Sequence, residues 1–185
     1  MMSNKLHIDN YNMNDTADLL LDTNILIQLF YPIMQNDYMK KYESLWNIIV
    51  HNKKNVLLPA IQISEFINCC IRFQFGLYKK ECGNDNLDFK KNYRNTDDYR
   101  EKMNAILDII TNDIIPFFTI VNDEFKSMNF DTLFIYGFSY DFNDAILVQI
   151  AEHYKANIVT HDVDFANYQS SITLISANSK LLKFS

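Results

Sequence analysis

The stretch Leu19–Asn24, with the sequence Leu-Leu-Leu-Asp-Thr-Asn, constrains the fold of this chain more than any other. Three consecutive leucines are typical of a short strand that is buried on both faces, as in a parallel sheet. Asp22, Thr23 and Asn24 are of the types that begin helices, and apolar residues continue at helical spacing from Ile25. A carboxylate therefore stands where a buried strand meets a helix, at the edge where α/β proteins bind ligands. A helix cap is an equally good interpretation of Asp22 alone.

Short apolar stretches alternate with helical patterns along the rest of the chain. We predict further strands at residues 55–58, 117–121, 157–160 and 172–175, and helices at about 23–34, 37–51, 60–75, 101–111 and 141–154. Residues 123–137 show no clear pattern. Strands that alternate with helices indicate a mainly parallel sheet. The sequence therefore predicts an α/β protein, a three-layer α/β/α sandwich with a central, mainly parallel sheet of about five strands.

The composition narrows the classes of function. A chain of 185 residues fits one domain, which we place at residues 18–185, after a loose or peripheral N-terminal arm at residues 1–17. Three cysteines, two of them adjacent, do not form a disulfide framework and indicate a cytoplasmic protein. Three widely separated glycines exclude a dinucleotide-binding loop and a P-loop. No apolar run approaches the length of a membrane span, so we expect no membrane partner.

Residues 72–102 differ in character from the rest of the chain. They contain eight of the 17 basic residues and six acidic ones, so this segment carries +2 and the remainder −8. We predict a helical insertion at about 77–100. Basic residues with interleaved aromatic rings can bind an RNA backbone and stack on bases, with Lys90, Lys91 and Arg94 as the contacts. The alternative is a solvated surface hairpin.

Four acidic residues stand at or near the ends of predicted elements. Asp22 and Asp162 follow strands, Asp144 lies in the first turn of a helix, and Glu65 lies on the helix that follows the strand at 55–58. Each alone also fits a cap, a favourable position in the helix dipole, or a solvent-exposed site. If the four converge, their like charges raise their pKa values, and a hard divalent cation relieves the repulsion. Such an ion activates water and stabilises charge on phosphate, so phosphodiester hydrolysis is the expected reaction.

Four short blocks, taken in order, resemble the signature blocks of the PIN-domain ribonucleases. They are Asp22-Thr23-Asn24, Ser64-Glu65-Phe66, Asp144-Ala145-Ile146 and Thr160–Phe165. The resemblance covers about residues 19–175 and implies an α/β/α endoribonuclease that depends on Mg²⁺ or Mn²⁺. The implied catalytic and metal-binding acids are Asp22, Glu65, Asp144 and Asp162, with Asp164 as an auxiliary metal ligand and Thr23, Asn24 and Thr160 as supporting hydrogen-bond partners.

The same resemblance implies partners. Many bacterial members of the family, similar to VapC, are toxins that act as dimers with a small antitoxin, so an RNA substrate, an antitoxin and a homodimer are expected. Two other interpretations stay open: a non-catalytic PIN-like scaffold that binds RNA or a protein, and a phosphatase or phospho-acceptor. A decayed scaffold is expected to lack one or more of the four acids, and all four are present. The phosphatase usually has a second acid where Asn24 stands.

Overall fold

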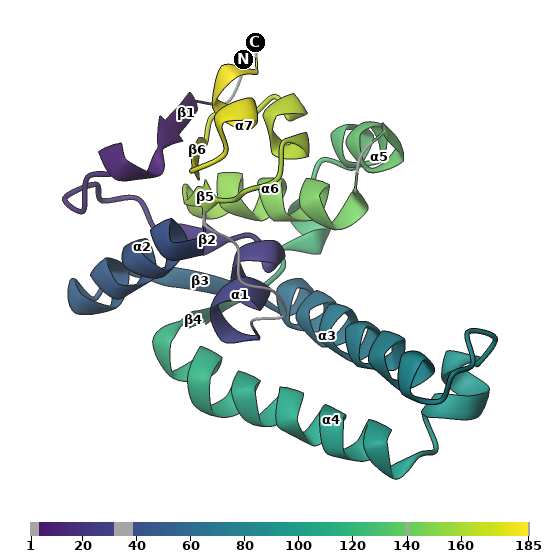
Figure 1. The fold of residues 1–185 in the computed structure, drawn as a ribbon. Helices are drawn as coiled ribbons and strands as arrows, with labels where there is room; N and C mark the ends of the chain where they lie inside the picture. The colour runs from purple at the N-terminus through teal and green to yellow at the C-terminus, as the bar shows by residue number, and fades with distance from the viewer. Residues whose placement is uncertain (1–3, 32–38, 140, 185) are drawn as a thin grey trace.

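The computed structural model describes residues 4–31, 39–139 and 141–184, and its centre is a six-stranded sheet (Figure 1). The strand order is β1-β6-β5-β2-β3-β4, and all five pairings are parallel. The predicted parallel α/β sheet is therefore confirmed, with the three leucines in an inner strand. The strands are β1 (Asn4–His7), β2 (Leu19–Leu21), β3 (Val56–Pro59), β4 (Thr119–Val121), β5 (Asn157–Val159) and β6 (Thr173–Ser176).

Helices cover both faces of the sheet (Figure 1). Leu19 and Leu21 belong to the buried cluster under α1 to α4, whereas Leu20 belongs to the cluster under α5, α6 and α7. This alternation follows from the two-residue period of a strand, and it explains why β2 is apolar at every position. The helices are α1 (Thr23–Phe30), α2 (Met39–His51), α3 (Ala60–Glu81), α4 (Asp97–Ile109), α5 (Phe130–Ser139), α6 (Phe142–Tyr154) and α7 (Ser179–Lys183).

The N-terminal residues differ from the prediction. Residues 4–7 form β1, which pairs with β6 at the edge of the sheet, so this part of the predicted N-terminal arm is peripheral rather than loose, and the sheet has six strands where about five were predicted. The prediction failed because an edge strand is only partly covered: polar Lys5 and His7 flank Leu6, and this leaves no strong apolar pattern. The parts of the predicted helices that fall at residues 32–38 lie outside the described residues.

A long helical hairpin extends beyond the sheet (Figure 1). Helix α3 continues without a break to Glu81, past the predicted end at Phe75, and α4 begins at Asp97 rather than at Glu101. Thr96 caps α4 because its side-chain oxygen accepts a hydrogen bond from the backbone N–H of Tyr99 at 3.1 Å. We call residues 72–109 the arm. It contains the predicted insertion at 77–100 and joins the body of the protein through the first half of α3.

Aromatic rings fill the interior of the arm. Five of them have neighbouring ring centroids 4.9–6.1 Å apart: Phe75, Tyr78, Phe89, Tyr93 and Tyr99. Phe89 is 7 % exposed and Tyr93 is fully buried. The prediction that the aromatic residues here stack on bases is therefore wrong for these two rings, whose burial holds the arm together instead.

No helix in the described part of the chain is both long and apolar enough to cross a membrane.

Candidate active site

Asp22 lies at the carboxyl end of β2 and is 3 % exposed. Its backbone N–H donates to the carbonyl of Val159 at 2.9 Å, which continues the pairing of β2 with β5. Its carboxylate makes no capping hydrogen bond to α1. Instead Oδ2 accepts a hydrogen bond from the hydroxyl of Thr160 at 2.8 Å. Asp22 therefore stands at the N-cap position of α1, where its backbone carbonyl accepts the N–H of Leu26 at 3.1 Å, while its side chain is held by the loop after β5.

Thr160 holds two of the predicted acids. It is fully buried, and the oxygen that donates to Asp22 also accepts the backbone N–H of Asp162 at 2.9 Å. Asp162 in turn accepts the backbone N–H of Asp164 at 2.9 Å through Oδ1. Asp164 is exposed and contributes this backbone contact. The loop after β5 thus fixes Asp162 beside Asp22.

Glu65 reaches the same end of the sheet from α3. The hydroxyl of Thr23 donates to its Oε2 at 2.9 Å, and the side chain is half-buried, so the interpretation as a fully solvent-exposed residue is wrong. Burial raises the pKa of Glu65, and the carboxylate of Asp141 adds to this, while the hydrogen bond from Thr23 lowers it. The predicted support from Asn24 is a long contact, because its amide nitrogen lies 3.5 Å from Oδ2 of Asp22.

Asp144 comes from the first turn of α6, where Asp141 caps the helix by accepting the backbone N–H of Asn143 at 2.8 Å. The capping interpretation of Asp141 is confirmed. Burial raises the pKa of Asp144 to about 9. The neighbouring carboxylates that add to this increase are Asp22, Asp141, Asp162 and Glu65.

The carboxylates also act on Asp22. Burial, with additions from Asp162 and Glu65, raises the pKa of Asp22 to about 7, while the hydroxyl of Thr160 and the backbone N–H of Asn24 partly offset the increase. Among the described residues, none of the ion pairs includes Asp22, Glu65, Asp144 or Asp162. Bringing carboxylates together in a partly buried site without a cation is costly. The structure therefore gathers negative charge that a bound cation would compensate.

The donor set suits a hydrated divalent ion. Carboxylate oxygens are the ligands that Mg²⁺ and Mn²⁺ prefer. Across residues 4–31, 39–139 and 141–184, no three His, Cys, Asp or Glu side chains are placed so that they could hold one metal ion. Mg²⁺ usually keeps several waters and takes one or two carboxylates, so it does not need such a cage. An open hollow of about 390 Å³ beside Asp162 has room for water; it is lined by Asn24, Ile25, Gln28, His161, Asp162 and Val163.

Tyr42 is a positioning residue that the sequence did not single out. It is 1 % exposed, and its hydroxyl donates to the carbonyl of Thr160 at 3.0 Å and lies 2.9 Å from Nδ1 of His161. The backbone N–H of Ala177 donates to the same hydroxyl at 2.9 Å. Helix α2 is thereby tied to the loops after β5 and β6. A tyrosine on the apolar face of a predicted helix is the signal, because its hydroxyl needs a partner when buried.

Two further polar residues near the acids were missed. Gln62 is 1 % exposed, and its side-chain amide donates to the carbonyl of Leu21, directly before Asp22. Asn143 hydrogen-bonds Glu65 through its side chain, which lowers the pKa of that carboxyl. Both lie in the first turn of a helix, and their spacing in the sequence gives no sign of these contacts.

The predicted RNA contacts lie elsewhere. Lys90 and Lys91 belong to a single helical turn at Phe89–Tyr93 in the arm, and Arg94 follows it. All three are exposed. The structure places them in the arm and does not bring them to the acids.

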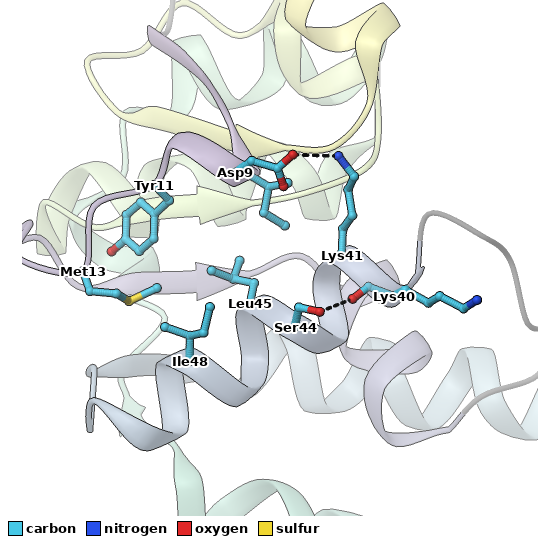
Figure 2. A pocket seen from close by; sticks show the side chains of 9 residues that line it. Asp9, Tyr11, Met13, Lys40, Lys41, Ser44, Leu45 and Ile48 are labelled. Atoms are coloured by element: carbon cyan, nitrogen blue, oxygen red, sulfur yellow. Dashed lines mark hydrogen bonds and ion pairs between the residues drawn. The ribbon is translucent and has the colours of Figure 1, made fainter.

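A second hollow, of about 340 Å³, lies between the N-terminal segment and α2 (Figure 2). Lys41 and Asp9 form an ion pair of 2.9 Å at its upper rim, and Met13, Leu45 and Ile48 supply apolar walls (Figure 2). None of the predicted acids lines it. This hollow is therefore separate from the candidate active site.

A family model described as the PIN domain matches residues 19–170, and the chain belongs to this family. PIN domain proteins are generally nucleases that use divalent metal ions. Comparison with curated proteins gives no match.

Three solved structures are similar to this chain at low sequence identity. VapBC2 from Rickettsia felis, bound to a DNA fragment from its promoter, is 17% identical with a TM-score of 0.45, over 85% of this chain and 97% of that one. FitAcB from Neisseria gonorrhoeae is 16% identical with a TM-score of 0.47, over 85% and 96%. FitAB bound to the IR36 DNA fragment is 16% identical with a TM-score of 0.49, over 86% and 94%.

Proposed function

We propose that this protein is a divalent metal-dependent endoribonuclease that hydrolyses phosphodiester bonds in RNA. The observation that carries the proposal is the coupling of four carboxylates at the carboxyl end of the sheet. Each of Asp22, Glu65 and Asp144 has a raised pKa to which other acids of the group or its neighbour Asp141 contribute. Such a group suits a cation better than any nucleophilic or acid–base mechanism that needs a serine, cysteine or histidine.

The chain's own residues hold and orient the oxygen ligands. Thr160 fixes Asp22 and Asp162 with one hydroxyl, and Thr23 fixes Glu65. Hydrogen bonds of this kind orient metal ligands and raise metal affinity. When bound, Mg²⁺ or Mn²⁺ lowers the pKa of a water and stabilises charge on a phosphate oxygen. The residues that would hold one or two such ions, directly or through water, are Asp22, Glu65, Asp144 and Asp162, with Asp164 as an auxiliary ligand.

The test is cleavage of a mixed RNA pool with Mg²⁺, Mn²⁺ or EDTA. We expect Asp22→Asn to lower metal-dependent cleavage by about 100-fold or more, because it removes a charged ligand. The variant is expected to stay folded, since an asparagine still accepts the hydrogen bond of Thr160, and circular dichroism checks this. Asp108→Asn is the matched control, because Asp108 is an exposed acid on α4.

Two results would contradict this function. Full activity of Asp22→Asn, or cleavage by the wild-type protein in EDTA, would remove the metal-site mechanism. No cleavage of any RNA by the wild-type protein would favour the alternative, a PIN-like scaffold that binds RNA or a protein without cutting it.

A protein partner is the second part of the proposal. The sequence resemblance predicts an antitoxin and a homodimer, and a row of exposed rings next to the acids offers an apolar surface of the kind that protein contacts use. The row consists of Phe125, Phe130, Phe134 and Phe142, which are 39–58 % exposed with neighbouring centroids 5.2–6.4 Å apart.

We expect a dimer in solution and a shift toward monomer in Phe134→Lys, because a charge in an apolar interface is not compensated. Light scattering after gel filtration measures the mass. Lys126→Phe, which adds a ring without adding a charge to the row, is the control and is expected to keep the dimer. A monomeric wild-type protein would contradict the homodimer.

A further inference from the structure

The two limbs of the arm carry opposite charge. Residues 72–94, which we call the basic limb, contain six basic and three acidic residues and so carry +3. Helix α4 contains four acidic and two basic residues and so carries −2. Both basic residues of α4 are paired with neighbours on that helix, Arg100 with Asp97 and Lys102 with Glu101. The positive charge available to a ligand is therefore concentrated on the basic limb.

A single face of α3 leads from the candidate active site into the basic limb. Glu65, Asn68, Arg72, Gly76 and Lys80 recur every three or four residues, so they share this face. Asn68, Arg72 and Lys80 are exposed, which leaves the face open to solvent. At 1.5 Å per residue, Arg72 lies about 10 Å and Lys80 about 22 Å along the helix axis from Glu65. We call this face the α3 stripe.

Two arginines, Arg72 on the α3 stripe and Arg94 after the helical turn at Phe89–Tyr93, lie over the same aromatic ring. The guanidinium of Arg72 lies 4.0 Å from the ring centroid of Phe89, and that of Arg94 lies 5.5 Å from the same ring. Phe89 is held in the aromatic interior, so it fixes both guanidinium groups at the surface of the arm. In the part of the chain that the structure describes, neither arginine takes part in an ion pair. Their donors are therefore available to phosphate oxygens.

Gly76 lies between these arginines and Lys80. A glycine inside a helix lowers its stability relative to alanine. No heavy atom lies within 4 Å of the position that a Cβ would take, so packing inside the protein does not require glycine here. Because glycine has no side chain, nothing projects from the α3 stripe at this point. The backbone of a nucleic acid strand can therefore approach the helix closely here.

We propose that the α3 stripe and the basic limb bind the backbone of the RNA strand that leads away from the cleavage site. Arg72 and Arg94 make the phosphate contacts nearest to Glu65. The proposal rests on the nuclease function proposed above and adds to it where the uncut part of the substrate lies. Because Phe89 and Tyr93 are buried, the contacts are with phosphates rather than with stacked bases, and they carry no sequence information.

Binding of a labelled single-stranded RNA in EDTA, followed by fluorescence anisotropy, tests the proposal without cleavage. We expect Arg72→Gln combined with Arg94→Gln to weaken binding about tenfold at low salt. The logarithm of the association constant decreases as the logarithm of the salt concentration rises, and the magnitude of this slope should be smaller by about 0.7 for each phosphate that the variant no longer binds. Arg100→Gln combined with Lys102→Gln removes the same charge from α4 and is expected to change the affinity by less than about twofold.

A second pair of variants adds charge instead of removing it. Gly76→Asp places a carboxylate on the α3 stripe in open space, so the helix is expected to stay folded. Gly76→Asp should weaken RNA binding, whereas Asn104→Asp, which adds the same charge at an exposed position of α4, should not. The substitution on the α3 stripe should reduce the affinity for a uridine homopolymer, an adenosine homopolymer and a DNA strand of the same length equally. The reason is that phosphate contacts distinguish neither base nor sugar.

The proposal is overturned if the variant with Arg72→Gln and Arg94→Gln has the same dissociation constant as the control with Arg100→Gln and Lys102→Gln. The basic limb would then be a surface for an acidic protein. Loss of affinity restricted to one homopolymer would also overturn the proposal. Cleavage measured with Mg²⁺ on the same preparations separates the two proposals. If the protein cleaves RNA with Mg²⁺ but the Arg72 and Arg94 substitutions leave RNA binding unchanged, only the proposal for the α3 stripe is overturned. Binding that depends on the arm without any cleavage supports the stripe while the nuclease function fails.

Discussion

At the scale of single residues, the raised pKa values of the acids make stability depend on pH. Asp144 has a pKa of about 9 in the folded protein, against 3.8 for an ordinary aspartate. The folded state therefore binds a proton that the unfolded state releases between about pH 4 and pH 9, so the metal-free protein loses stability as pH rises through this range.

We expect Asp144→Asn in EDTA to raise Tm by several degrees near pH 8 and to raise it less near pH 5, because the cost of taking up a proton on folding grows as pH rises toward the folded-state pKa of Asp144. Thermal melting followed by circular dichroism measures this. Asp108→Asn is again the control and should show no such dependence on pH. An equal gain at both pH values would show that proton uptake by Asp144 on folding is not the cause.

The residue scale also shows what the sequence could predict about the site. Asp141 is recognisable as a cap because its partner, the N–H of Asn143, is two residues away. The partner of Asp22 at 2.8 Å is Thr160, which is 138 residues away, so the local pattern indicates the position of Asp22 at the start of α1 but not this contact. Asp22, Asp144 and Asp162 are identifiable because each follows a strand or lies in the first turn of a helix, positions that the apolar pattern reveals, whereas Glu65 lies inside α3.

At the scale of elements, an aromatic interior holds the two limbs of the arm together. Tyr93 is fully buried, and its ring lies within 5.8 Å of those of Phe75, Tyr78, Phe89 and Tyr99, measured between centroids. Its hydroxyl donates to Asp98 at 2.8 Å, which joins the end of the basic limb to the first turn of α4. Loss of this ring is therefore expected to loosen the arm.

We expect Tyr93→Ala to destabilise the arm by about 3–5 kcal/mol, the usual cost of removing a large buried ring. Tyr93→Phe keeps the ring, removes one hydrogen bond, and is expected to cost about 1 kcal/mol. Limited proteolysis with mapping of the cut sites is the measurement. Faster cutting within residues 82–96 in the alanine variant alone is expected, and equal cutting in both variants would contradict the role of the ring.

Elements are predictable where burial on both faces imposes a clear pattern. The strands β2, β3 and β5 are fully buried, and their apolar residues reveal all three. Strand β1 was missed because the edge of the sheet is partly exposed. Helix α5 was missed because Phe130, Phe134 and Ile135 are exposed apolar residues that obscure the division into buried and solvent faces.

At the scale of the whole molecule, the net charge of −6 conceals an uneven distribution. The acids gather at the carboxyl end of the sheet, and the basic limb extends away from them. The Debye length is about 8 Å at physiological ionic strength, so Lys80, about 22 Å along α3 from Glu65, is largely screened from the acids. An overall negative charge is therefore compatible with a local surface that attracts phosphate.

The order of the strands in the sheet has a consequence for the making of the protein. Synthesis delivers β2 and Asp22 early, but β2 pairs with β5, and Asp162 follows β5. The carboxylates therefore cannot meet until the ribosome has released most of the chain, since N-terminal segments emerge first. The first strand, β1, can pair only after β6 has been synthesised, which is later still. An unfinished chain has no complete site, so a growing copy of the proposed nuclease is unable to cut the messenger that encodes it.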